Sequence, residues 1–192
     1  MKAWHFVNST LRDGAPIPAD GVMLKFDGTP ILCEQGLHAS LHPFDALQHA
    51  PGGTLCLVEC GGIVVHGDDK LVCTERTILA RMDSVPLLRH FARMQALSVV
   101  HLWEPPEVVL DYLMTGDESI RDAAKAAAWA AAGDAAGDAA KAAAWAAAGD
   151  AAWDAAWAAA RDAARDAAGD AAWDAAKKSF NDSARECFAD FV

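Results

Sequence analysis

The run Asp122–Lys177 consists almost entirely of tetrapeptides: residues 122–137 read DAAKAAAWAAAGDAAG, and residues 138–153 read DAAKAAAWAAAGDAAW. The first position of each tetrad holds Asp or Ala, the next two are always Ala, and the fourth holds Trp, Gly, Lys or Arg. Ala has the highest helix propensity of all residues, so the repeat predicts α-helix with little tertiary support. We expect one long continuous helix and favour it over a bundle of short helices broken at Gly133, Gly149 or Gly169.

Five tryptophans occupy the fourth position of these tetrads. Four residues advance a helix by about 400°, so that position drifts by about 40° per tetrad and the rings spiral around a straight helix. Large exposed rings favour burial against a partner. The two nearly identical blocks also fit a recent duplication, in which the spacing of the rings was not selected. The pattern predicts a helical arm that binds another protein or a second copy of the chain through Trp129, Trp145, Trp153, Trp157 and Trp173, with Phe188 and Phe191 of the apolar tail.

The residues before the repeat carry most of the bulky apolar side chains and predict a compact domain. Short apolar segments between Gly, Asp and Pro turns predict strands near residues 4–7, 22–26, 30–33, 54–60, 63–66, 71–73 and 76–79. Helices are expected to start near Pro43, at Ser84 and at Glu107. Because the turns are short, we expect an α+β fold with a small antiparallel or mixed sheet over residues 1–116, followed by the helical arm over residues 117–192.

The charge balance narrows the range of partners. The chain has 27 acidic and 16 basic residues, a net charge of −11, and no cluster of Lys and Arg, which disfavours nucleic acid and anionic membranes. No stretch of about 20 strongly apolar residues predicts a membrane span. The odd number of cysteines, five, behind no secretory leader predicts reduced thiols and an intracellular, cytoplasmic protein.

Motifs for metal or phosphate chemistry are weak. His38 and His42 have the i, i+4 spacing of helical metal ligands, but Pro43 indicates that the helix begins only after them. Cys56 and Cys60 lie four apart on a predicted strand, which is a poor zinc spacing and fits buried, inert thiols better. The sequence contains no Gly-rich phosphate loop, nucleophile elbow or HExxH motif, and we expect no bound metal.

The first 80 residues nevertheless carry a suggestive order of segments. Trp4-His5, then the segment GLHAS (residues 36–40), then the strand LCLVEC (residues 55–60) resembles the nucleotide-binding half of the ADP-ribosyltransferase fold. The resemblance implies that His5 holds the ribose of NAD, that His38 stands where the family has a Tyr stacked on nicotinamide, and that Glu75 is the catalytic acid.

The chain as a whole resembles an uncharacterised family of bacterial and phage proteins. Shared phrases are WHFVN, GLHAS, HGDDK, HLWEPPEVV and YLMTGDES, followed by Ala-rich repeats that are also similar to those of predicted bacterial immunity proteins. The resemblance implies a setting in phage–host or toxin–immunity conflict. Two hypotheses follow: a non-enzymatic interaction protein without a cofactor, or an NAD-dependent ADP-ribosyltransferase-like enzyme with the repeat as its oligomerisation element.

Overall fold

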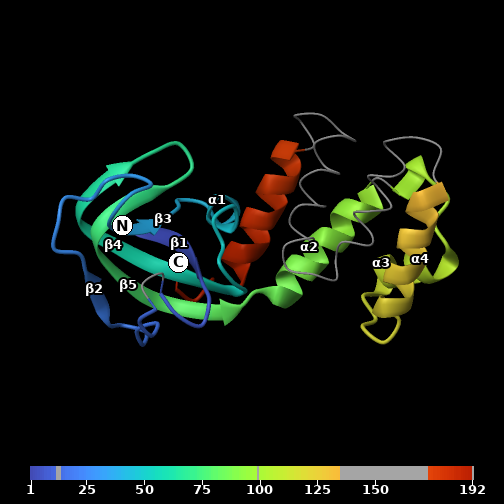
Figure 1. Cartoon of the computed structure of the whole chain (residues 1–192), viewed down its shortest axis with the longest axis horizontal. Coiled ribbons are helices and arrows are strands. Elements are labelled where there is room, and N and C mark those ends of the chain that lie inside the picture. Colours follow the sequence, from blue (N-terminus) through green and yellow to red (C-terminus); the bar gives the residue numbers. More distant parts are fainter. Residues whose placement is uncertain (12–13, 99, 135–172, 192) are drawn as a thin grey trace. The chain divides into compact units, whose positions relative to one another are not determined.

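The computed structural model describes residues 1–11, 14–98, 100–134 and 173–191 (Figure 1). Its elements, in chain order, are β1 (Lys2–Val7), β2 (Met23–Lys25), β3 (Leu37–Ala39), α1 (Pro43–Leu47), β4 (Thr54–His66), β5 (Leu71–Asp83), α2 (Val85–Ser98), the 3-10 helix η1 (Val100–Leu102), α3 (Glu107–Thr115) and α4 (Arg121–Asp134). A further helix covers residues 173–186. None of the helices in these ranges is both long enough and apolar enough to cross a bilayer.

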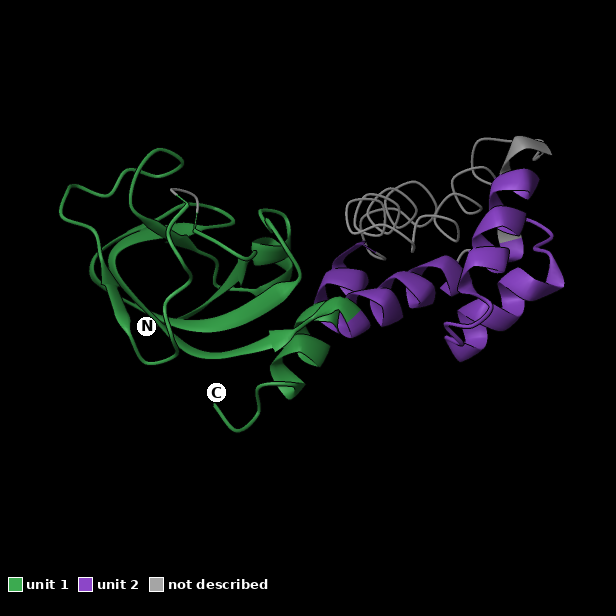
Figure 2. Ribbon diagram, turned by 60° about the horizontal axis from the view of Figure 1, so that its bottom comes forward, with its two compact units in different colours: residues 1–85, 180–192 green, residues 86–179 purple. Residues whose placement is uncertain are grey.

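The chain divides into two compact units (Figure 2). The sheet unit comprises Met1–Val85 and Phe180–Val192, and the helical unit comprises Pro86–Ser179. The boundary near the end of the chain falls inside the helix of residues 173–186. The sheet unit is therefore built from both ends of the sequence.

The described strands form one five-stranded antiparallel sheet, as the α+β prediction for this part of the chain expected. Strands run in the order β1-β4-β5-β2, and β3 pairs with the first part of β5. Just beyond β3, Ser40 and Trp4 exchange two backbone hydrogen bonds of 2.7 and 2.8 Å. The pairing thus returns to β1, and the strands curve around one interior (Figure 2).

The two long strands of the sheet differ from the four short ones that the sequence predicts in this region. Gly61-Gly62 is not a turn between two strands, because β4 continues through it with a shift of register between Gly61 and Val64. Gly62 has φ +68°, a left-handed value that favours glycine, and Thr74 Oγ1 accepts the N–H of Ile63 at 2.9 Å. The two glycines therefore make a β-bulge that bends one strand.

Side chains pack on both faces of the sheet. Inside the curve lies a cluster of small apolar and thiol side chains: Ala3, Val7, Ala39, Cys56, Val58, Cys60, Leu71, Cys73 and Ile78. Elsewhere in the unit, Trp4 meets the ring of Phe188 edge-on with centroids 5.2 Å apart, and Phe44 of α1 meets Phe180 in the same way at 5.9 Å. The end of the chain thus supplies large rings to the core of the sheet unit.

The helical unit has a core of its own. Tyr112 and Leu113 of α3 are buried against Ala96 of α2 and against Ala124 and Ala128 of α4. Alanine lets two helices approach closely, so α4 packs on α3 through the small side chains of the first tetrads. Gly116, in the left-handed region at φ 69°, ends α3 and lets the chain turn into α4.

The predicted architecture, an α+β domain that carries a long Ala-rich helical arm, is wrong. The described start of the repeat is not a separate arm, because Ala124 and Ala128 are core residues of the helical unit. The described end of the repeat leads into a helix whose residues from Phe180 onward belong to the sheet unit. The choice between one continuous helix and a Gly-broken bundle concerns residues 135–172, which lie outside the described residues.

Candidate functional site

His5 lies on β1 inside the sheet unit, half-buried, with Cys56 of β4 as its register partner. Burial lowers the pKa of its imidazole well below the usual value of 6.5, and the charge of Arg76 and the nearby His38 lower it further. The ring is therefore neutral at physiological pH. A neutral imidazole offers one N–H donor and one acceptor without adding charge.

His38 lies on β3 and is tied into the same neighbourhood. Its Nε2 accepts the backbone N–H of Cys33 at 3.1 Å, which places the ring proton of a neutral His38 on Nδ1. Its carbonyl oxygen accepts a hydrogen bond from Nη1 of Arg76. The pairing of β3 with β5 therefore brings the backbone of His38 to Arg76. The Trp4–Ser40 bridge shows that the His38 side chain lies on the face of Trp4, opposite to the face of His5.

Glu75 is held apart from this group. Its carboxylate pairs with Lys25 Nζ of β2 at 3.3 Å, and about a third of its side chain is exposed. A Cβ built on Gly61, its register partner, would lie 3.4 Å from Glu75 Oε2, so the carboxylate lies over that glycine. Glu75 is also not among the groups that shift the pKa of His5. The three residues that the resemblance singled out therefore do not share one site, since His5 and His38 lie on opposite faces of the sheet and Glu75 pairs with Lys25.

Arg76 is the central residue that sequence reasoning missed. Only 6% of it is exposed, and it lies on β5 opposite Cys60 of β4. The sequence did hold a signal: the alternation of a strand places Arg76 on the same face as Ile78, which is buried. An arginine on the apolar face of a strand needs a specific reason to be there.

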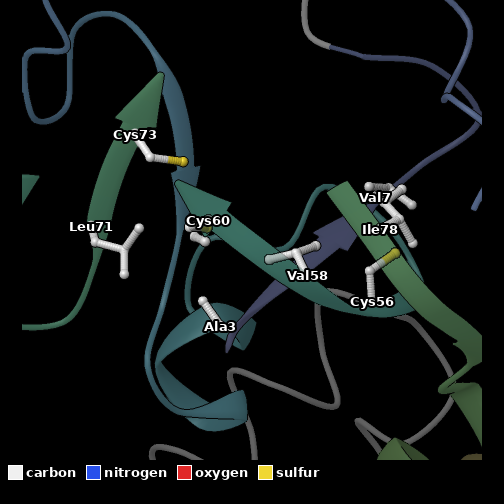
Figure 3. Packing of buried hydrophobic residues seen from close by; sticks show 9 residues of the cluster. Ala3, Val7, Cys56, Val58, Cys60, Leu71, Cys73 and Ile78 are labelled. Carbon is white, nitrogen blue, oxygen red and sulfur yellow. The ribbon is translucent and has the colours of Figure 1, made fainter. Parts of the chain in front are cut away.

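The cluster on this face contains three buried free thiols, from Cys56, Cys60 and Cys73 (Figure 3), and Cys60 is the register partner of Arg76. The thiol of Cys60 donates a hydrogen bond to Cys73. This bond and the charge of Arg76 hold the pKa of Cys73 below its usual range. The same bond, together with burial, raises the pKa of Cys60. Burial raises the pKa of Cys56 to about 11. The prediction that Cys56 and Cys60 are buried is confirmed. Within the described residues, no group of three or more His, Cys, Asp or Glu side chains could hold a metal ion.

The aromatic residues expected to bind a partner fall into different environments. Trp129 of α4 is 54% exposed, and Phe191 is 51% exposed. Trp173 lies near Lys177, whose Nζ is 5.9 Å from the ring centroid. Phe188 is only 2% exposed because it packs on Trp4 inside the sheet unit. The other three predicted positions, Trp145, Trp153 and Trp157, lie outside the described residues.

Comparison with known proteins gives one match. Residues 1–90 match the model of a family described as a domain of unknown function, DUF7666. No curated protein and no solved structure matches the chain. The matched range holds the five described strands together with His5, His38 and Arg76, but not the tail that completes the core.

Proposed function

We propose that the sheet unit is a binding module for NAD or a related nucleotide. The observation that supports the proposal is the position of His5 on the inner face of the curved sheet near Arg76, a buried cation that is bonded to the backbone carbonyl of His38. These two histidines are the residues that the resemblance to ADP-ribosyltransferases assigns to the NAD ribose and to nicotinamide. The neutral imidazole of His5 can contribute polar contacts to a sugar or a ring.

The proposal is one of binding, not of transfer. An ADP-ribosyl transfer would need a carboxylate beside the bound sugar, and Glu75 is instead engaged by Lys25. The buried thiols do not replace it, because Cys60 and Cys73 have almost no exposed surface. We therefore propose a binding protein that acts inside a bacterial or phage-infected cell, in the phage–host or toxin–immunity setting that the sequence resemblance implies.

The test is a titration of the full chain with millimolar NAD, followed by calorimetry and by thermal unfolding. We expect the ligand to raise the unfolding temperature of the wild type and to lose at least about tenfold in affinity in His5→Ala. His66→Ala is the matched control, since His66 lies on β4 with its side chain exposed and outside the cluster. An unchanged unfolding temperature in the wild type rejects the proposal.

We propose self-association as a second candidate function, favoured by the exposed rings of Trp129 and Phe191. Rings that stay this exposed gain free energy when a second copy covers them. Sedimentation velocity of the wild type against a Trp129→Ser, Phe191→Ser double variant tests it. A monomeric wild type at high concentration, or a variant that associates as the wild type does, rejects this candidate.

A further inference from the structure

Arg76 carries a buried positive charge without a carboxylate partner among the described residues. Its one hydrogen bond there runs from Nη1 to the carbonyl oxygen of His38. Four other arginines form ion pairs with carboxylates: Arg81, Arg89, Arg121 and Arg185. A guanidinium taken out of water without a counter-ion is strongly disfavoured, so an unpaired one in a core points to a ligand that is itself negative.

The free donors of this site are not completely shielded from solvent. Arg76 Nε and Nη2 and the ring nitrogens of His5 form no hydrogen bond within the described part of the chain. Among the described residues, none of these atoms is both fully buried and without a partner. Solvent therefore reaches them, and a ligand atom could replace the water.

The groups around Arg76 leave its charge only partly balanced. From β4 it is faced by Cys56 and Cys60, from β5 by Cys73, and from β3 by the neutral backbone carbonyl of His38. Cys73 Sγ donates to the carbonyl oxygens of Leu37 and Glu75, so it is a thiol and not an anion there. A sulfur also accepts hydrogen bonds more weakly than a carboxylate or phosphate oxygen. The site therefore favours a harder oxygen anion.

We propose that Arg76 and His5 bind a phosphoryl group. The Nε–Nη2 edge of the guanidinium can hold two oxygens in parallel, and the N–H of neutral His5 is a third donor from a different strand. Three donors on two side chains match a tetrahedral phosphoryl group better than a planar carboxylate, whose two oxygens the guanidinium edge already satisfies. The inference rests on the proposed nucleotide-binding function. It adds that the diphosphate of the nucleotide is the part that Arg76 holds.

The experiment titrates the full chain with inorganic phosphate, pyrophosphate and NAD by calorimetry. We expect pyrophosphate to bind the wild type and to lose at least about tenfold in affinity in Arg76→Met. Lys25→Met is the matched control: it removes a positive charge from the same unit at a mostly exposed side chain, and we expect a change of less than about twofold. If Arg76→Met does not fold, Arg76→Lys takes its place. Lysine keeps the charge but lacks the parallel donors of the guanidinium, so we expect an intermediate loss of affinity.

The outcomes separate this inference from the proposed function. If pyrophosphate binds through Arg76 and NAD does not bind, the phosphoryl site stands with a free phosphate or pyrophosphate as its ligand, and the nucleotide proposal fails. If NAD binds the wild type and Arg76→Met equally, the nucleotide proposal stands and the phosphoryl site is wrong. If neither phosphate nor pyrophosphate binds the wild type and NAD also leaves it unchanged, both fail.

Discussion

The backbone N–H of Phe44 donates a hydrogen bond of 2.8 Å to Oδ1 of Asn181, a residue 137 positions further along the chain. Phe44 lies in the first turn of α1, and His42, the N-cap residue of that helix, makes no capping bond with its side chain. Asn181 therefore supplies from the tail the acceptor that a local Ser or Asp usually provides. The last residues of the chain are an integral part of the sheet unit.

Removal of this acceptor should weaken the sheet unit. We expect Asn181→Ala to lower the free energy of unfolding by about 1 kcal/mol, the usual cost of a lost helix cap. Urea unfolding followed by circular dichroism measures the change. Asn8→Ala is the control, since Asn8 is an exposed residue of the same unit, and equal effects of the two substitutions would argue against a capping role.

Two phenylalanines three positions apart should differ sharply when truncated. Phe188 is 2% exposed and packs edge-on against Trp4, whereas Phe191 is 51% exposed. We expect Phe188→Ala to cost about 3–5 kcal/mol and Phe191→Ala to stay within about 0.5 kcal/mol. Urea unfolding of both variants decides the point. Similar losses in the two variants would contradict the docked position of the tail.

The sequence predicted the sheet better than the arrangement around it. Apolar runs between Gly and Asp turns located β1, β4 and β5, because alternation and turn residues act over a few positions. The docking of Phe180 and Phe188 on Phe44 and Trp4 depends on contacts between the two ends of the chain, which no local pattern reveals. The Ala-rich tetrads predicted a separate arm because Ala propensity is a local quantity, whereas the burial of Ala124 depends on α3.

For the candidate site, too, local sequence predicted some features, and others depend on how the strands pair. His5 and His38 were singled out by a resemblance of short segments, but the strand pairing places their side chains on opposite faces of the sheet. Glu75 and Arg76 are neighbours in sequence, but their environments differ. Glu75 pairs with Lys25, whereas Arg76 lies near the buried thiols. Which of two adjacent strand residues faces the interior depends on register and bulges, so sequence reasoning did not reveal that Arg76 lies on the inner face.

Acidification should destabilise the sheet unit through His5. The pKa of His5 is lowered in the folded state. When the pH falls below about 6.5, the pKa of His5 in the unfolded chain, His5 is therefore protonated in the unfolded chain but stays neutral in the folded chain. The contribution of neutral His5 is therefore present above pH 6.5 and is lost as the pH falls below it. Urea unfolding at pH 7 and pH 5 should show a smaller loss in His5→Gln than in the wild type. Parallel losses in the two proteins would contradict the buried, neutral state of His5.

The bulge in β4 gives a paired test at adjacent glycines. Gly62 has φ +68°, and a Cβ built there would lie 2.1 Å from Thr74 Oγ1, the atom that accepts the N–H of Ile63. At Gly61 the nearest atom to such a Cβ is Glu75 Oε2 at 3.4 Å, an ordinary contact, and no left-handed φ is required. We expect Gly62→Ala to cost more than about 1 kcal/mol of unfolding free energy through backbone strain and the displaced Thr74. Gly61→Ala should be neutral to within about 0.5 kcal/mol, since the lower chain entropy of Ala in the unfolded state offsets the tighter packing. Chemical denaturation of the two variants gives the comparison, and equal stabilities would mean that the strand does not bend at Gly62.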